Sequence, residues 1–88
     1  GVFAVRVETP SGSYGGMANV GPKPSFPDEP PVLEAHLFDF AGDLYGQEIE
    51  VRFERFLRGQ VKFSGLEALR AQLERDREAA RAALAETA

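Results

Sequence analysis

Apolar and polar residues alternate along several stretches of the chain, which is the pattern of β-strands that bury one face. Residues 1–8 alternate first. Residues 14–20 form a second short stretch, which we expect to pair with the first across a turn at 9–13 that is rich in Ser and Gly. The third predicted strand covers residues 32–40, and the fourth covers residues 47–57. The alternation is typical of antiparallel strands that bury one face and expose the other.

Two local features stand out in the predicted strands. The pair Gly15-Gly16 predicts either a β-bulge or a point where another backbone or a ligand comes close. Arg55 falls among the apolar positions of the fourth strand, against its alternation.

The third predicted strand carries two polar residues inside an apolar run. Glu34 and His36 are two positions apart, so on an extended chain they point to the same side, together with Phe38 and Phe40. A carboxylate on a buried face is costly unless a partner satisfies it. This pair is therefore the first candidate for a functional group.

After residue 63 the spacing of the apolar residues changes from every second residue to about every 3.6 residues. This change predicts a helix over residues 64–86. Ser64 with Glu67 three positions later forms a capping box, with Ser64 as the N-cap. We expect the helix to pack an apolar stripe over the sheet. The stripe consists of Leu66, Leu69, Leu73, Ala80 and Leu84.

The predicted fold class is mainly β with a C-terminal helix, in one domain over residues 1–88 with its strands in 1–57 and its helix in 64–86. Four strands of this length make an awkward closed barrel. We therefore expect an antiparallel, Greek-key-like β-barrel that is incomplete within these residues and is capped by the one long helix.

Composition narrows the class of protein. The chain has 88 residues, 43% hydrophobic and 27% charged, with a net charge of −4 and only two lysines. This balance disfavours a nucleic-acid partner, whose binding needs clustered basic residues. The chain has no cysteine, so it has no disulfide framework or thiol nucleophile. No apolar run approaches the roughly 20 residues of a membrane span, and we expect a cytoplasmic protein without a membrane partner.

Residues 21–31 carry five of the six prolines and predict a surface loop, because proline cannot occupy a central strand. The loop contains neither of the glycine-rich signatures that cradle phosphates in nucleotide-binding proteins.

Four segments in order carry a resemblance: GVFAV, MANVGPKPSF, LEAHLFDFAGDLYG and FLRGQVKFSGLEALRAQLERD. Together they resemble the riboflavin kinase family, in particular the C-terminal kinase module of bacterial bifunctional riboflavin kinase/FAD synthetases, over nearly the whole chain. The resemblance implies transfer of the γ-phosphoryl group of ATP, with Mg²⁺, to the ribityl 5′-hydroxyl of riboflavin to give FMN. It also implies a covalently linked N-terminal FAD synthetase domain in the parent protein.

The chain departs from the family pattern in two places. Ser25 stands where threonine is usual. The family's N-terminal segment ending in Pro-Thr-Ala-Asn, whose Thr and Asn hold the magnesium and the phosphates, has no counterpart in these residues. We therefore expect a truncated kinase domain, with no metal ligand within this chain, that is inactive alone if the upstream segment is required.

The resemblance assigns Glu34 as the general base that accepts the hydroxyl proton. The alternative for Glu34 is a carboxylate at a sheet edge that hydrogen-bonds a backbone amide. His36 is expected to line the ligand site or to be a satisfied core group.

Around the nucleotide pocket the resemblance places Asn19, Gly21 and Pro24, for which a proline-stiffened loop is the alternative. Arg58 is expected to contact flavin or phosphate, or else to be a solvated loop charge. For Asp76 we favour a buried hydrogen bond to a neighbouring strand over a flavin contact.

Two other classes of function remain open. One is a non-catalytic flavin-binding barrel module. The other is an OB-like barrel for single-stranded nucleic acid, which the acidic charge disfavours.

Overall fold

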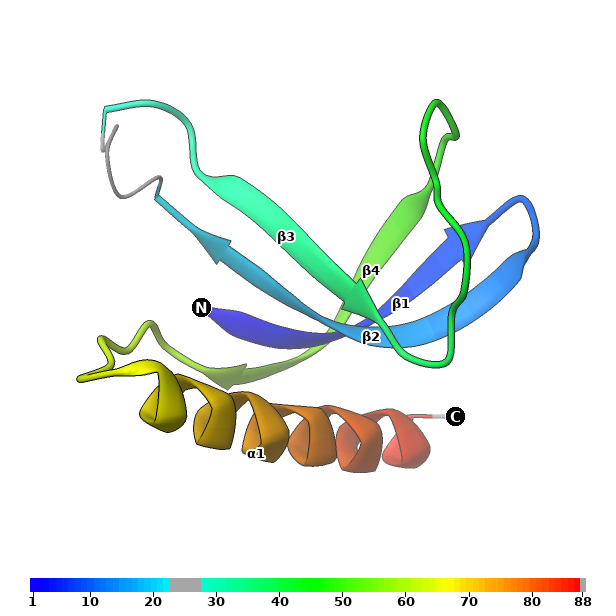
Figure 1. Cartoon of the computed structure of the whole chain (residues 1–88). Helices are drawn as coiled ribbons and strands as arrows, with labels where there is room; N and C mark the ends of the chain where they lie inside the picture. The colour runs from blue at the N-terminus through cyan, green and yellow to red at the C-terminus, as the bar shows by residue number, and fades with distance from the viewer. Residues whose placement is uncertain (23–27, 88) are drawn as a thin grey trace.

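The computed structural model describes residues 1–22 and 28–87. Four strands and one helix follow each other along the chain (Figure 1). Their bounds are β1 Val2–Thr9, β2 Gly12–Gly21, β3 Val32–Leu37, β4 Glu50–Arg58 and α1 Leu66–Glu86.

The strands form one antiparallel sheet in the order β3-β2-β1-β4. Three consecutive strands lie side by side and the fourth returns beside the first, which is the Greek-key arrangement. The two end strands of this order do not pair with each other, so the sheet curls without closing (Figure 1). The prediction of an incomplete Greek-key barrel with a helix on one side is confirmed.

The central strand β1 places apolar side chains on both faces of the sheet. Ala4 belongs to a cluster with Phe38 and the helix residues Ala80, Ala83 and Leu84. The alternate positions Val5 and Val7 are fully buried in a second cluster on the opposite face, which includes Ala18. A strand with buried residues on both faces must be central, and β1 is the strand with a neighbour on each side.

A register shift in the pairing of β4 with β1 explains why Arg55 falls among the apolar positions of this strand. Val5 pairs with Phe53 and Ala4 pairs with Arg55, so β4 has one more residue than β1 over this step. Such a bulge reverses the alternation of the bulged strand. It turns Arg55 to the face that carries α1, where its guanidinium binds the Glu86 carboxylate.

The face opposite α1 carries an aromatic cluster. Phe3 contacts Phe53 and Phe56 edge to face, with ring centroids 5.1 and 5.3 Å apart. Phe53 and Phe56 remain 49% and 59% exposed. Apolar side chains thus lie open to solvent on this face.

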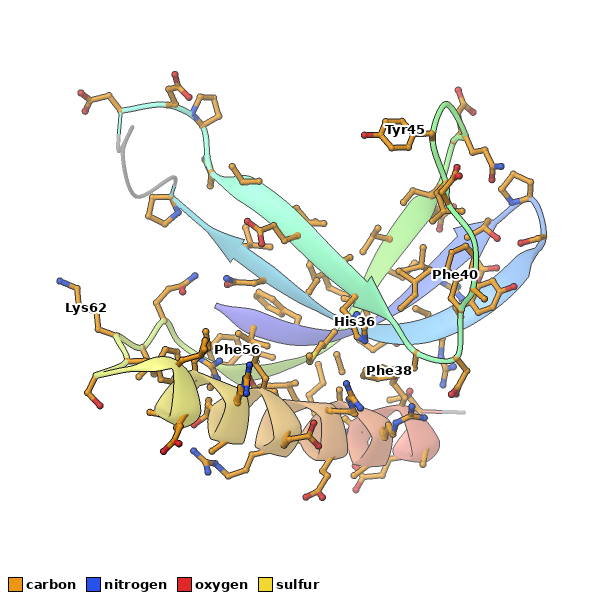
Figure 2. The ribbon with its side chains drawn as sticks, viewed as in Figure 1. His36, Phe38, Phe40, Tyr45, Phe56 and Lys62 are labelled. Atoms are coloured by element: carbon orange, nitrogen blue, oxygen red, sulfur yellow. The ribbon has the colours of Figure 1, made fainter. Side chains whose placement is uncertain are left out.

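The helix packs on the sheet mainly through its C-terminal half. Ala80, Ala83 and Leu84 are buried, whereas Leu66 and Leu73 are 62% and 40% exposed. Of the predicted stripe, Leu66 and Leu73 are therefore not packed closely on the sheet, whereas Leu69 between them is half-buried. Figure 2 shows Phe38 between the sheet and α1, at the half where the contact is closest.

The N-terminal end of the helix differs from the capping box that the sequence suggests. The N-cap is Gly65, and no side chain caps this end, so Ser64 does not act as predicted.

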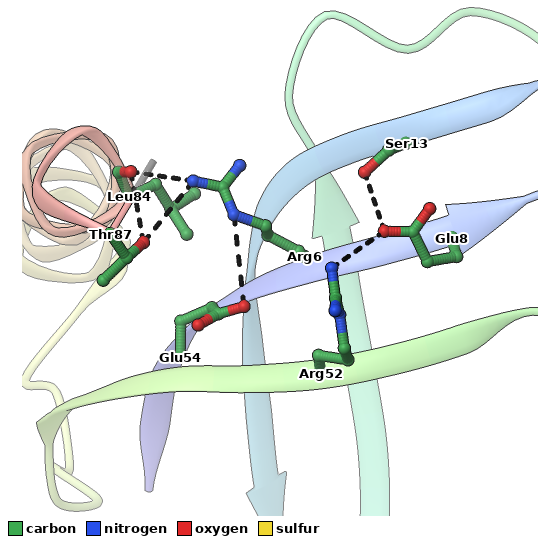
Figure 3. A network of polar contacts seen from close by, with 7 residues as sticks. All are labelled: Arg6, Glu8, Ser13, Arg52, Glu54, Leu84 and Thr87. Carbon is green, nitrogen blue, oxygen red and sulfur yellow. Dashed lines mark hydrogen bonds and ion pairs between the residues drawn. The ribbon is translucent and has the colours of Figure 1, made fainter.

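At the C-terminal end of α1, no basic residue lies in the last turn of the helix. Arg6 of β1 supplies the charge instead, because its Nη2 donates to the Leu84 carbonyl at 2.8 Å (Figure 3). A cation beside the last carbonyls of a helix is stabilising.

Backbones of β2 and β3 approach closely at the predicted glycine pair. The β1–β2 register runs without a bulge through Gly15 and Gly16. A Cβ on Gly16 would lie 2.4 Å from the His36 carbonyl oxygen, whereas a Cβ on Gly15 would meet the tip of the Leu84 side chain at 2.8 Å. Of the two predicted alternatives, the close approach of another backbone is correct.

The glycine pair provides a matched test of this packing. We expect Gly16→Ala to lower the free energy of unfolding by about 1–3 kcal/mol, because two backbones must separate. Gly15→Ala should cost less, since the Leu84 side chain can rotate and alanine loses less backbone entropy on folding. Urea denaturation of both variants measures the difference. Equal losses would contradict the close approach at Gly16.

Candidate functional site

A cavity of about 350 Å³ lies between the first half of α1 and the sheet face that α1 covers. Strands β1, β2 and β3, the end of β4 and the helix all contribute to its wall. Its apolar lining consists of Val2, Met17, Ala18, Ala35, Leu69 and Leu73, and its polar lining consists of Asn19, Glu34, His36, Arg58 and Asp76.

The polar residues of β3 face this cavity as their spacing predicts. Glu34 pairs with Asn19 of β2, and His36 pairs with Met17, so all four side chains share one face of the sheet. Glu34 and His36 are both exposed, so neither carries the cost of a buried polar group.

The alternation of β3 does not continue to the predicted residue 40. Asp39 adopts a left-handed backbone with φ 59°, which ends the strand after Leu37. Phe38 still packs on the helix side, 5.9 Å from the His36 ring. Phe40 instead contacts Tyr14 edge to face at 5.0 Å, on the opposite face of the sheet. The expectation that Phe40 shares a face with Glu34 is wrong.

No side chain in the described part of the chain engages the Glu34 carboxylate. β3 is an edge strand, as one alternative supposed. Within residues 1–22 and 28–87, however, no backbone amide or side chain hydrogen-bonds this carboxylate. It is therefore available to a ligand in the cavity.

The opposite wall is held by an ion pair between β4 and α1. Arg58 donates from Nε and Nη2 to the two carboxylate oxygens of Asp76 at 2.8 and 2.7 Å. Gln72, one helical turn before Asp76, donates to the same carboxylate at 2.9 Å. Asp76 is only 3% exposed. The favoured expectation of a buried hydrogen bond from Asp76 to a neighbouring strand is confirmed, and the solvated loop charge is excluded for Arg58.

The ion pair shifts the pKa values of both partners. The hydrogen bonds from Arg58 hold the pKa of Asp76 below its ordinary value of 3.8, against the opposing effect of burial. The same hydrogen bonds raise the pKa of Arg58. Both groups are therefore charged at neutral pH, and their charges compensate each other within the wall.

The connection between β4 and α1 reaches back to the end of β2. The Gln60 side-chain nitrogen donates to Asn19 Oδ1 at 2.8 Å and to the Val20 carbonyl at 3.1 Å. The Phe63 ring lies 5.9 Å from the Arg58 guanidinium carbon. The segment after β4 is thus anchored beside the cavity at two points.

The structure brings together four of the six predicted binding and catalytic residues. Asn19, Glu34, His36 and Arg58 line the cavity. Gly21 is not part of the lining but lies against Gln60, and Pro24 falls outside the described residues.

Gln60 and Gln72 are two residues at the site that sequence patterns did not predict. The spacing of Gln72 and Asp76 by one helical turn could have suggested that they interact. Nothing in the sequence links Gln60 to Asn19, which is 41 residues away.

Comparison with known families identifies the family of the chain. A family model described as flavokinase, riboflavin kinase, matches residues 1–84. The chain belongs to the riboflavin kinase family.

Several relatives carry the same family domain within longer proteins. The chain is 42% identical over 83 residues to a bifunctional riboflavin kinase/FMN adenylyltransferase of Haemophilus influenzae, covering 93% of this chain and 27% of the relative. It is 43% identical over 89 residues to the protein of the same name from Pseudomonas fluorescens, covering 100% and 29%. The chain therefore spans little more than a quarter of the length of these relatives.

A solved structure of similar fold belongs to a protein with a different name. It is described as a macrolide-efflux protein from Streptococcus pneumoniae, and it matches with a TM-score of 0.82 and 36% identity over 92% of this chain and 27% of its own. The name describes that protein, and no efflux role is transferred from it to this chain. In the described part of this chain, α1 is not apolar enough to cross a membrane.

The family resemblance implies Mg²⁺, an ion that prefers oxygen ligands such as carboxylates. Across residues 1–22 and 28–87, no three His, Cys, Asp or Glu side chains converge to hold a metal. The carboxylate of Asp76 is already neutralised by Arg58. The described His, Asp and Glu residues thus offer no three-ligand site for the ion.

The ion pair predicts a specific stability loss. Asp76→Asn keeps the size but removes the charge that Arg58 needs. We expect the free energy of unfolding at pH 7 to fall by about 3–5 kcal/mol, because a half-buried guanidinium loses its counter-charge. Urea denaturation measures this loss. The control Glu78→Gln removes an exposed charge from the same helix and should change stability by less than about 0.5 kcal/mol.

The pH dependence of this loss follows from the lowered pKa of Asp76. A carboxylate with a depressed folded pKa stabilises the fold above its unfolded value and loses that contribution as the pH falls through the folded value. The difference between wild type and Asp76→Asn should therefore stay constant from about pH 7 to pH 5 and shrink below about pH 4. A difference that grows in acid would contradict the ion pair.

Proposed function

We propose that this chain is the riboflavin-phosphorylating domain of a longer protein. In this reaction the γ-phosphoryl group of ATP moves to the ribityl 5′-hydroxyl of riboflavin, giving FMN and ADP. The observation that carries the proposal is the unengaged carboxylate of Glu34 in the wall of a cavity, in a chain whose family match covers residues 1–84.

The chemistry of the cavity suits this substrate. Its volume of about 350 Å³ lies in the range of sites for small molecules. Riboflavin combines a flat aromatic ring system, with an apolar dimethylbenzene end, and a chain of hydroxyl groups. The apolar wall includes Leu69 and Leu73 of α1, and the polar wall includes Asn19 and Glu34. The two walls therefore complement the two parts of the substrate.

Glu34 acts as the general base in this proposal. Its carboxylate accepts the proton of the 5′-hydroxyl as the oxygen forms a bond to the γ-phosphorus, and the bond from that phosphorus to the β–γ bridging oxygen breaks. The electron pair of the broken bond leaves with ADP. Positioning of the hydroxyl and acceptance of its proton are the contributions that a protein makes to phosphoryl transfer.

His36 and Arg58 have supporting roles in the proposal. His36 lines the cavity beside Glu34 and offers a ring nitrogen to the ligand. Arg58 already donates to Asp76 through Nε and Nη2 and to the Gly59 carbonyl through Nη1, so a contact with flavin or phosphate would use the remaining N–H groups of Nη1 and Nη2. Gly21 lies at the end of β2, and we assign Gly21 and Pro24 to the nucleotide side of the site. Asn19 lies opposite Glu34 in the cavity wall, and we assign it to the riboflavin side.

The proposal also covers parts of the longer protein that lie outside this chain. The relatives named above are bifunctional, and this chain matches little more than a quarter of each. We therefore propose that an FMN adenylyltransferase (FAD synthetase) part is linked to this domain, and that Mg²⁺ and ATP are bound with the help of residues outside the described ones.

Replacement of Glu34 tests the assignment. In the full-length protein we expect Glu34→Gln to lower kcat for FMN formation by about 10²–10⁴-fold, because general-base help is lost while the amide keeps the shape. The control Glu48→Gln removes an exposed carboxylate from the loop before β4 and should leave kcat unchanged. FMN is measured by chromatography with riboflavin and MgATP.

The outcomes separate the alternatives. If both variants match the wild type, Glu34 is not the base. If the wild type binds riboflavin but forms no FMN, the non-catalytic flavin-binding module replaces the kinase.

A further inference from the structure

Gln60 makes two contacts that together determine the orientation of a neighbouring side chain. Its Nε2 lies 3.1 Å from the backbone carbonyl oxygen of Val20. A carbonyl oxygen can only accept hydrogen bonds, so the amide group of Gln60 must turn its nitrogen toward β2. A backbone group thereby fixes an amide orientation that side-chain shape alone leaves open.

The second contact transmits this orientation to Asn19. The same nitrogen lies 2.8 Å from the Asn19 side chain. The atom of Asn19 that receives this donor must be the carbonyl oxygen Oδ1. The amide is planar, so its nitrogen Nδ2 then points away from Gln60. Among the described residues, no partner occupies the two N–H donors of Asn19, so they can bind a ligand.

The cross-strand neighbour of Asn19 is Glu34. The two residues are directly opposite in the β2–β3 register, and both line the cavity. Side chains directly opposite on one sheet face have Cβ atoms about 4.5–5.5 Å apart. An N–H donor and a carboxylate acceptor therefore stand side by side. A hydroxyl group accepts one hydrogen bond and donates another, so it fits between them.

We propose that Gln60 is a positioning residue that orients Asn19 so that Asn19 and Glu34 together bind a hydroxyl group of the ligand. The inference rests on the proposed function, in which that hydroxyl belongs to the ribityl chain of riboflavin. It assigns to the site a residue, Gln60, from the connection between β4 and α1.

Gly21 has a place in this arrangement. A Cβ at Gly21 would lie 2.3 Å from Gln60 Nε2, so glycine leaves the space that the Gln60 amide occupies. Its backbone does not need the left-handed region. Gly21→Ala would therefore displace Gln60 from Asn19 without changing any polar group of the site.

The test compares two flavins in binding titrations of the full-length protein without ATP, followed by flavin fluorescence. Riboflavin carries the ribityl hydroxyls, whereas lumiflavin has the same ring system with a methyl group in place of the chain. The variant Gln60→Glu cannot donate to Val20 or Asn19. We expect Asn19 to turn its oxygen toward Glu34 and riboflavin affinity to fall about tenfold, while lumiflavin affinity stays unchanged.

Gly21→Ala should give the same selective loss by steric displacement, which makes the result independent of the added charge. Gln47→Glu adds the same charge in the exposed loop between β3 and β4 and should leave both affinities unchanged. If Gln60→Glu weakens both flavins equally, or weakens neither, the positioning role is overturned.

A failure of the proposed function has a different signature. Wild type that binds riboflavin and shows the selective effect of Gln60→Glu, but forms no FMN with MgATP, overturns the kinase activity and supports the positioning role. Wild type that binds neither flavin overturns both.

Discussion

The ion pair between Arg58 and Asp76 holds the site together. The helix packs tightly on the sheet only in its second half, where alanines allow close approach. Its first half carries exposed leucines, and apolar packing is weak there. The bidentate contact between the last residue of β4 and the middle of α1 fixes the distance between helix and sheet at that point. Arg58 and Asp76 line one side of the cavity. Their contact therefore sets the width of the cavity between helix and sheet.

Charge is distributed unequally around the cavity. On the helix side, the charges of Arg58 and Asp76 cancel within hydrogen-bonding distance. On the sheet side, Glu34 has no such partner among the described residues. A paired wall and an unpaired carboxylate suit a site that holds an uncharged ring against apolar side chains and acts on one hydroxyl group. Asn19 and Gln60 add the direction in which that hydroxyl is held.

The sequence predicted the elements better than their ends and contacts. Alternation and short apolar runs located every strand, because successive side chains of a strand point to opposite faces of the sheet. These patterns could not show that β3 stops at Leu37, since this depends on the left-handed backbone of Asp39. They also could not show that a bulge turns Arg55 toward α1, because bulges arise from pairing with β1. The exposure of Leu66 and Leu73 depends on how the helix sits on the sheet, which periodicity does not record.

In the candidate site, too, residue spacing predicted some features, and others depend on tertiary contacts. The two-residue spacing of Glu34 and His36 was sufficient to place them on one face, and the family resemblance supplied the role proposed for Glu34. The partners of these residues come from distant segments. Arg58 meets Asp76 across 18 residues and Gln60 meets Asn19 across 41, and both contacts depend on the tertiary fold.

The most direct measurement is a riboflavin titration of the isotopically labelled protein, followed by backbone and side-chain NMR shifts. Two surfaces could accept a flavin ring: the cavity under α1, and the exposed aromatic face of Phe3, Phe53 and Phe56. This account predicts that the resonances of Asn19, Glu34 and Leu69 shift and that those of Phe53 and Phe56 do not. Shifts confined to the aromatic face would contradict it.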